Sequence, residues 1–138
     1  MNKSDLELLA ELRIKEAETL LSSSHFHGAY YLAGYALECA LKACIAKKVN
    51  QHDFPNKKLA DDSYSHDLSK LVGVAGLKTD LSQREQSDQV FSLNWAVAKD
   101  WSERSRYEID ITQAQARDLV AAISDNNNGV LQWLKNYW

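Results

Sequence analysis

Residues 27–48 read HGAYYLAGYALECALKACIAKK, and this stretch decides the fold. It is compatible with helix throughout, and between Gly28 and Leu41 the only residue charged at neutral pH is Glu38. A helix that is apolar on most sides must lie at the centre of its domain, with other elements packed around it. The stretch therefore predicts the central helix of a helical protein, which we expect to end near Val49.

Three lines of side chains run along this helix at helical spacing. The first contains small residues, against which a neighbouring helix can approach closely: Ala29, Ala33, Ala36, Ala40 and Ala43. The second supplies bulkier packing: Tyr30, Gly34, Leu37, Leu41 and Cys44. The third is polar: Tyr31, Tyr35, Glu38 and Lys42. We expect this polar line to face a rim, a partner subunit or a site.

Helices are also predicted on both sides of the central one. A capping box at Ser4 and Glu7 starts a helix over residues 5–21, whose predicted inner face is Leu6, Leu9, Ala10, Ala17 and Leu20. Residues 50–65 lose periodicity and contain the only proline, which indicates a loop. A short helix over residues 67–75 follows, and Gly76 is placed to end it in a left-handed cap.

The second half of the chain predicts two more helices. The first begins at Asp80 with Gln83, and its predicted buried residues are Val90, Phe91, Trp95, Val97 and Ala98. After a connection over residues 102–111, Thr112 opens the last helix, with an inner face of Ala116, Val120, Ile123, Val130 and Leu134. The run from Asn126 to Gly129 is a turn signal, but the helical phase is the same on both sides, so we expect one helix with a weakened middle.

No segment alternates with period two for long enough to form a strand. The predicted fold class is therefore all-α, an up-and-down four-helix bundle with an additional short helix, in one domain over residues 1–138.

Composition excludes several classes of function. The net charge of −3 argues against general, salt-dependent electrostatic binding of nucleic acid. Cys39 and Cys44 are five residues apart on different faces of one helix, which excludes a zinc knuckle or a Cys-x-x-Cys redox pair and fits a reducing cytosol. The first residues carry acids where a signal peptide would be basic, and the central run is too short to span a membrane. We expect a cytoplasmic protein without a membrane segment or a cofactor.

Three segments in order resemble HEPN-domain proteins, which are small prokaryotic helical bundles linked to nucleotidyltransferases and RNA-targeting defence systems. They are GAYYLAGYALECALKACI at 28–45, SHDLSKLVGVAGL at 65–77 and WSERSRY at 101–107. The resemblance extends from about Arg13 to the C-terminus. It implies a homodimer with a cleft at the dimer interface, a nucleotide or RNA as ligand, or a separately encoded nucleotidyltransferase as partner in a defence or toxin-antitoxin setting.

The chain departs from the family at the catalytic motif. Catalytic HEPN ribonucleases carry an Arg, four to six residues, and then a His near the start of the last helix. No His follows Arg104 or Arg106 in this chain, whose four histidines are His25, His27, His52 and His66. The resemblance is therefore to the fold and not to the active site, and it implies a binding or interaction module without catalysis.

Arg106 and Tyr107 match the Arg-Tyr pair that closes the fourth helix in this family. A guanidinium can hold a phosphate and a neighbouring phenol can stack on a base, whereas in the structural alternative Arg106 bridges helix ends and Tyr107 plugs the bundle. We expect the ligand-binding residues to converge from several elements: Arg106, Tyr107, Glu38, Lys42, Tyr35, Tyr31 and His66. Glu38 and Lys42 can equally form a simple ion pair at the rim.

Other functions stay open. A metal-independent ribonuclease can be built from Arg104 and Arg106 with His66. An HD-type metal phosphohydrolase would use His66 and Asp67 with further ligands from His25, His27, His52, Asp88, Asp100 or Asp110. In the structural alternative to that metal site, Ser65 or His66 caps the short helix and Asp67 complements its dipole. A purely structural scaffold is the remaining case.

Overall fold

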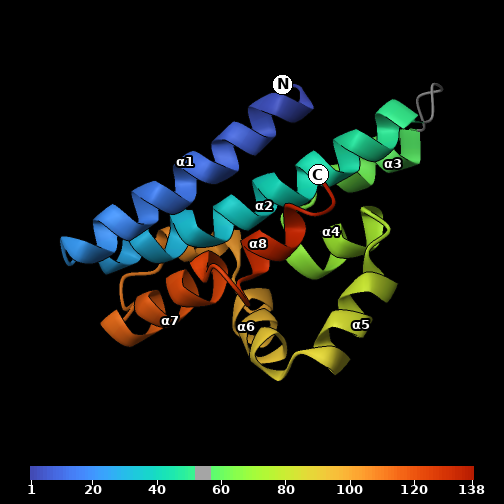
Figure 1. The fold of residues 1–138 in the computed structure, drawn as a ribbon. Coiled ribbons are helices and arrows are strands. Elements are labelled where there is room, and N and C mark those ends of the chain that lie inside the picture. The colour runs from blue at the N-terminus through green and yellow to red at the C-terminus, as the bar shows by residue number, and fades with distance from the viewer. Residues whose placement is uncertain (52–56) are drawn as a thin grey trace.

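The structure is a computed structural model that describes residues 1–51 and 57–138. Within these residues it is an all-α bundle without strands, which confirms the predicted fold class (Figure 1). In chain order its elements are α1 (Lys3–Ser22), α2 (Phe26–Gln51), α3 (Lys57–Ser63), α4 (Leu68–Val74), α5 (Lys78–Ser87), α6 (Gln89–Lys99), the 3-10 helix η1 (Glu103–Tyr107), α7 (Gln113–Ser124) and α8 (Val130–Leu134).

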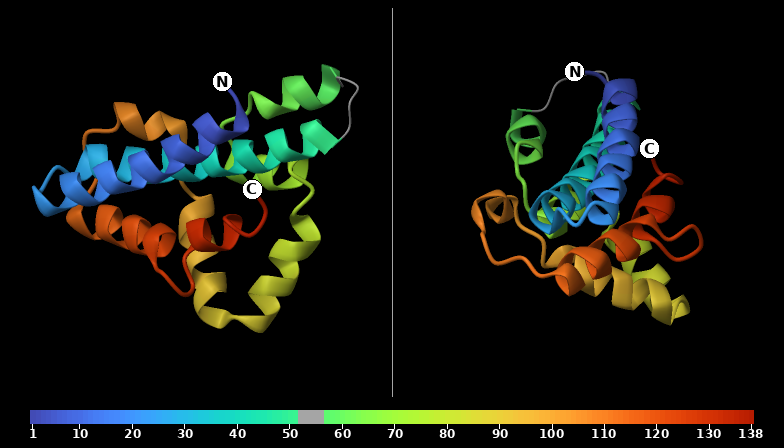
Figure 2. Two further views of the ribbon diagram at one scale, coloured as in Figure 1. Left: turned by 45° about the horizontal axis from the view of Figure 1, so that its top comes forward. Right: turned by 90° about the vertical axis from the view of Figure 1, so that its left-hand side faces the viewer.

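The helix α2 is the central element, as predicted. The helix α1 runs antiparallel beside it, and α4, α7, α8 and η1 also pack on it (Figures 1 and 2). The line of small residues is completely buried: Ala29, Ala33, Ala36, Ala40 and Ala43. These alanines let the neighbouring helices approach closely, so α2 forms the core that the other elements share.

The capping box of α1 lies two residues earlier than predicted. The side chain of Asn2 accepts from the backbone N–H of Asp5, and the Asp5 carboxylate accepts from the N–H of Asn2. Asn is as good a cap as Ser, so the helix gains a further half turn. Of its predicted inner face, Ala10 and Ala17 are fully buried.

The predicted fourth helix is two helices, α5 and α6, which meet in a V on the side of the bundle opposite α1 (Figures 1 and 2). Asp88 ends the first and caps the second by accepting from the N–H of Phe91 at 3.0 Å. The side chains that α6 buries are Phe91, Trp95 and Ala98.

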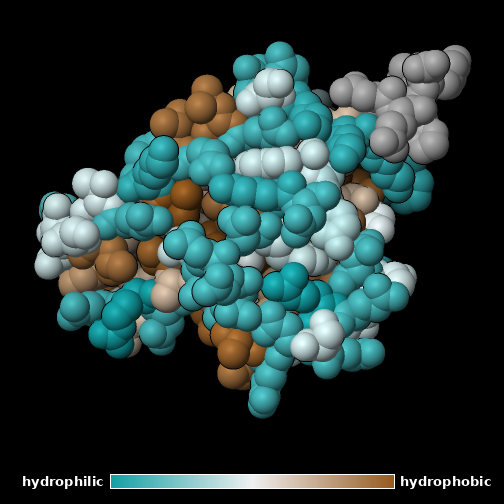
Figure 3. All heavy atoms as spheres, viewed as in Figure 1, coloured by the Kyte–Doolittle hydropathy of each residue, from teal (hydrophilic) through white to brown (hydrophobic). Residues whose placement is uncertain are grey.

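Two residues expected in the core of this helix are exposed. Val90 is 53% exposed and Val97 is 39% exposed, because both lie on the face of α6 that turns away from Phe91. Leu93 on the same helix is also exposed. Figure 3 shows apolar residues at the surface over α6, at the lower edge of the view.

The predicted last helix is also two helices, which contradicts the expected single one. The chain leaves α7 at Ser124, where Asp125 accepts from the N–H groups of Asn127 and Asn128 at 2.8 and 2.7 Å. Because these two N–H groups donate to a side chain, they cannot donate to the carbonyl groups of a continuing α-helix. The run therefore ends α7. All five predicted inner-face residues are nevertheless buried.

The region between α2 and α4 contains a helix where a loop was expected. Residues 57–63 form α3. Residues 52–56 of the predicted loop lie outside the described residues. Asp67 caps α4 by accepting from the N–H of Lys70 at 3.1 Å, so the cap is neither Ser65 nor His66. Gly76 has a φ of +74°, as its predicted left-handed conformation requires.

Candidate functional site

The short helix η1 is held against the polar line of α2 by the indole of Trp101. This side chain is buried and lies over Gly34, where a Cβ atom would overlap the ring. The Trp101 ring also packs beside Tyr31, with 6.1 Å between ring centroids. The missing side chain at position 34 therefore makes room for the residue that anchors η1.

The polar line of α2 carries a buried carboxylate. Glu38 is only 2% exposed, and Nζ of Lys42 donates to its Oε1 at 2.9 Å. The ring Nδ1 of His66 lies 2.9 Å from the same oxygen. A buried carboxylate needs such partners, since its isolated charge would be very costly away from water.

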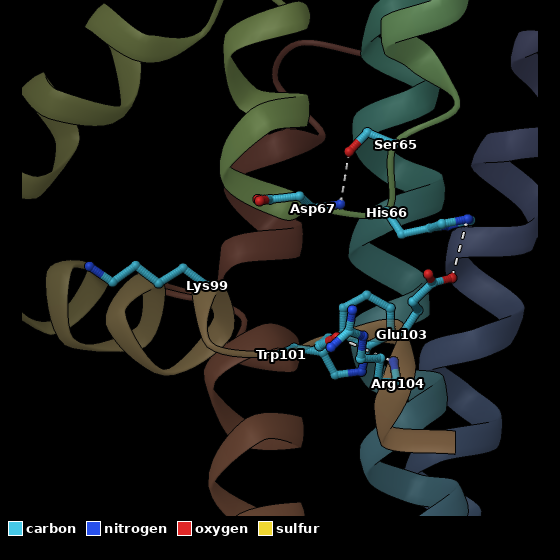
Figure 4. A pocket seen from close by; sticks show the side chains of 8 residues that line it. Ser65, His66, Asp67, Lys99, Trp101, Glu103 and Arg104 are labelled. Carbon is cyan, nitrogen blue, oxygen red and sulfur yellow. Dashed lines mark hydrogen bonds and ion pairs between the residues drawn. The ribbon is translucent and has the colours of Figure 1, made fainter. Parts of the chain in front are cut away.

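The imidazole of His66 reaches a second carboxylate on η1. Its Nε2 lies 3.2 Å from Oε2 of Glu103, the contact that Figure 4 draws between these side chains. The His66 side chain therefore lies between Glu38 of α2 and Glu103 of η1. Three segments that are distant in sequence meet at this imidazole.

Beside His66 lies an open pocket of about 390 Å³. Its lining comes from the segment before α4 and from the stretch that runs from the end of α6 into η1: Ser65, His66, Asp67, Lys99, Trp101, Ser102, Glu103 and Arg104. In Figure 4 the Glu103 carboxylate points to His66, while the Lys99 side chain extends away from both. The pocket thus combines hydroxyl, carboxylate and guanidinium groups around one imidazole.

A second cluster lies at the end of η1. The guanidinium of Arg106 sits 4.8 Å from the centroid of the Tyr107 ring. The nearby Tyr107 phenol, followed by the Tyr31 side chain, raises the pKa of Arg106, so the guanidinium stays charged. Tyr107 is 74% exposed, which excludes its alternative role as a plug of the bundle.

Tyr31 connects this second cluster to the polar line of α2. Its ring stacks on Tyr35 with 6.0 Å between centroids. Burial, followed by the nearby Cys39 and Glu38 side chains, raises the pKa of the Tyr35 phenol. Tyr35 therefore remains a neutral hydrogen-bonding group between the two clusters.

The residues expected in one site thus form two neighbouring clusters. Glu38, Lys42 and His66 contact one another, and Arg106 contacts Tyr31. Tyr31 and Glu38 are seven residues apart on one helix, or about 10 Å along its axis. A ligand of nucleotide size spans this distance.

Sequence reasoning missed the role of Glu103, and that of Trp101 as the anchor of η1. Glu103 gave no signal, because a carboxylate in a polar connection is ordinary. Gly34 did give one, since a glycine on the bulkier line of a buried helix marks a place where a large side chain can approach.

The contact between α2 and η1 contains polar atoms without partners. Within the described residues, three buried side-chain atoms lack a hydrogen bond: Oε2 of Glu38, Nε1 of Trp101 and Oγ of Ser105. Unpaired buried polar atoms cost free energy, so this contact is less stable than its burial suggests.

The part of the chain that the structure describes also bears on the metal site and on a membrane segment. No group of three or more His, Cys, Asp or Glu side chains there is arranged to hold a metal ion, which is the arrangement that an HD-type phosphohydrolase requires. His25 and His27 are exposed at the start of α2, and His52 lies outside the described residues. No helix in the described ranges is both long and apolar enough to cross a membrane.

Comparison of the chain with protein-family models, with curated proteins and with solved structures finds no match.

Proposed function

We propose that this protein is a HEPN-like binding module whose ligand is a nucleotide or a short single-stranded RNA, held at the face formed by η1 and the polar line of α2. The observation that carries the proposal is the exposed pair of Arg106 and Tyr107, which borders Tyr31 on the central helix. The HEPN resemblance supports the same ligand class.

The chemistry of this pair suits a phosphate next to a base. A guanidinium recognises phosphate oxygens with two parallel N–H groups, and an exposed phenol ring offers a stacking surface. The overall charge of −3 leaves little attraction for a long polyanion. The proposed ligand is therefore short and is held by local contacts.

A binding assay tests this proposal. The probe is a fluorescein-labelled RNA of mixed sequence, and its anisotropy is followed as protein is added. We expect Arg106→Ala and Tyr107→Ala each to weaken binding by about tenfold or more, the size of one charge-assisted contact or one stacked base. The matched control is Arg117→Ala, which removes an exposed guanidinium from α7.

Two results would overturn the proposal. One is a wild-type protein that binds neither the RNA nor a competing mononucleotide. The other is an Arg106→Ala protein that binds as tightly as the Arg117→Ala control.

One observation favours a second candidate, the metal-independent ribonuclease. His66 and Arg104 line the same pocket, so an imidazole and a guanidinium are within reach of one phosphate. The same RNA, separated on a denaturing gel after incubation, tests this candidate. Cleavage that is lost in both His66→Ala and Arg104→Ala would make the protein a ribonuclease.

The partners implied by the HEPN resemblance belong to the proposal as well. They are a second copy of this chain in a homodimer and a separately encoded nucleotidyltransferase. Light scattering of the purified protein measures its molar mass, and a monomer at all concentrations would exclude the homodimer.

A further inference from the structure

The imidazole of His66 is placed between two carboxylates that belong to different elements. Its Nδ1 lies 2.9 Å from Oε1 of Glu38, which is buried on α2. Its Nε2 lies 3.2 Å from Oε2 of Glu103, which is partly exposed on η1. An ionised carboxylate only accepts hydrogen bonds, so each contact is favourable only when the facing nitrogen carries a proton.

This geometry depends on the protonation state of His66. The imidazolium has an N–H at both nitrogens and donates to both carboxylates, whereas the neutral ring has one N–H. After loss of a proton, the lone pair of one nitrogen faces a carboxylate oxygen. One of the two contacts then becomes repulsive.

The two carboxylates differ in the free energy that each loses when the imidazole N–H no longer donates to it. Oε1 of Glu38 is away from water, and its Oε2 has no partner among the described residues. Glu103 can turn to solvent, which hydrates it. Glu38 keeps only Lys42 as a partner and cannot turn to water, so a missing N–H costs more free energy there than at the exposed Glu103. The remaining N–H therefore stays on the side of Glu38, and the contact to Glu103 is lost.

The other charged groups around His66 leave this picture unchanged. From α2, the ammonium of Lys42 donates to the same Glu38 oxygen. From the other sides, the pocket around the imidazole contains Asp67, Lys99 and Arg104. The Asp67 carboxylate is occupied by the cap of α4, and Lys99 extends away. Among these residue types, histidine alone ordinarily changes its charge between pH 5 and 8.

We propose that His66 is a proton-dependent latch, which fastens η1 to α2 when the imidazole is charged and releases η1 when it is neutral. The element it holds is short, and its contact with α2 contains unpaired polar atoms, so it belongs to the parts of a fold that open at low cost. Because η1 also carries Arg106 and Tyr107, the latch regulates the ligand site. That last consequence rests on the proposed function, whereas the latch itself does not.

The test of the latch is amide hydrogen exchange by NMR at pH 5.5 and pH 8, corrected for the intrinsic pH dependence of exchange. The reporters are the amides of Ser105 and Glu108, which donate within and just after η1. We expect the corrected protection of both to be about fivefold higher at pH 5.5, the effect of one hydrogen bond. In His66→Gln the protection becomes independent of pH, because a side-chain amide does not change its charge.

Two further variants make the test specific. Glu103→Gln removes the carboxylate on η1 from an exposed position, so it should also abolish the pH dependence without unfolding the protein. His27→Gln removes an exposed histidine at the start of α2 and should leave the dependence as in the wild type. Protection that does not change with pH in the wild type, or changes equally in His66→Gln, would overturn the proposal.

Binding of the labelled RNA at pH 6 and pH 8 then separates the two proposals. If the RNA binds, its affinity should be higher at pH 6, and this difference should vanish in His66→Gln. If the RNA does not bind at either pH, the proposed function fails, and the amide exchange still decides on the latch. If the RNA binds but protection is insensitive to pH, the latch is wrong and the binding module stands.

Discussion

The indole of Trp101 occupies the space that any side chain on Gly34 would need. This relationship fixes the start of η1 on the central helix, because the indole ring packs directly against the backbone of Gly34. It also explains a glycine in the middle of a long helix, where alanine would be about 1 kcal/mol more favourable.

We therefore expect Gly34→Ala to destabilise the protein, although it improves helix propensity. The new Cβ overlaps the indole, and such overpacking typically costs about 1 to 3 kcal/mol. Urea unfolding measures the change. The control is Gly28→Ala on the same helix, where the Cβ only meets the end of the Leu20 side chain. A Gly34→Ala protein as stable as the wild type would mean that Trp101 is not held there.

Removal of the buried carboxylate should be more costly. Glu38→Ala leaves Lys42 without its partner and cuts one side of the His66 bridge, so we expect a loss of about 3 kcal/mol, at the lower end for buried pairs because Lys42 reaches solvent. Glu38→Gln keeps an acceptor oxygen and should lose less. Equal losses for both variants in urea unfolding would contradict this expectation, because they would show that the acceptor oxygen kept by glutamine contributes nothing and that the whole loss comes from the charge.

The two thiols should be inert in the folded protein. Burial raises the pKa of Cys39 to about 11 and that of Cys44 to about 12, so almost no thiolate exists near neutral pH. We expect neither to react with an aromatic disulfide reagent at pH 8, and both to react once guanidinium unfolds the chain. A fast reaction of one thiol in native buffer would contradict its burial on α2.

Acid should weaken the junction between α6 and the turn after α7. The backbone N–H of Phe91 lowers the pKa of Asp88, and the N–H groups of Asn128 and Asn127 lower that of Asp125. Carboxyl groups with a lowered folded-state pKa stabilise the protein fully above their ordinary value of 3.8, and this stabilisation is lost as pH falls below it. Urea midpoints measured from pH 7 to pH 2 should therefore fall at the acid end.

The variant Asp88→Asn tests which residue is responsible. Asparagine also caps helices but does not titrate, so its acid loss should be smaller than that of the wild type. An identical acid profile would assign the loss to other carboxylates.

The sequence could predict the central helix and the fold class because burial on nearly all sides leaves a long apolar pattern. It could also place the start of the last helix at Thr112, which caps α7 in the structure and forms a capping box with Gln115. The sequence could not predict the two helix breaks, and the reason is the same for both. At Asp88 and Asp125 a carboxylate takes backbone N–H groups from the next few residues, and the apolar phase continues across the break.

The helix α3 was missed for the opposite reason. Its residues, 57–63, include none that are buried, so no apolar period marks it. A short helix of this kind is held by its neighbours rather than by its own pattern.

Part of the candidate site followed from the sequence. Helical spacing brings Glu38 and Lys42 together, and the pair is present at 2.9 Å. The approach of His66 to Glu38 and of Arg106 to Tyr31 depends on how remote segments fold back on α2, which no local pattern encodes. Ligand binding by these residues stays a prediction.

The position of α2 at the centre of the bundle has a consequence for synthesis of the protein. The helix is complete once residue 51 has been made, but part of its cover comes from α7 and α8, more than sixty residues later. Until then its apolar sides are open to water or to other chains. A growing chain thus exposes an apolar helix surface while more than sixty further residues are translated, so a nascent-chain chaperone that shields α2 should raise the yield of folded protein.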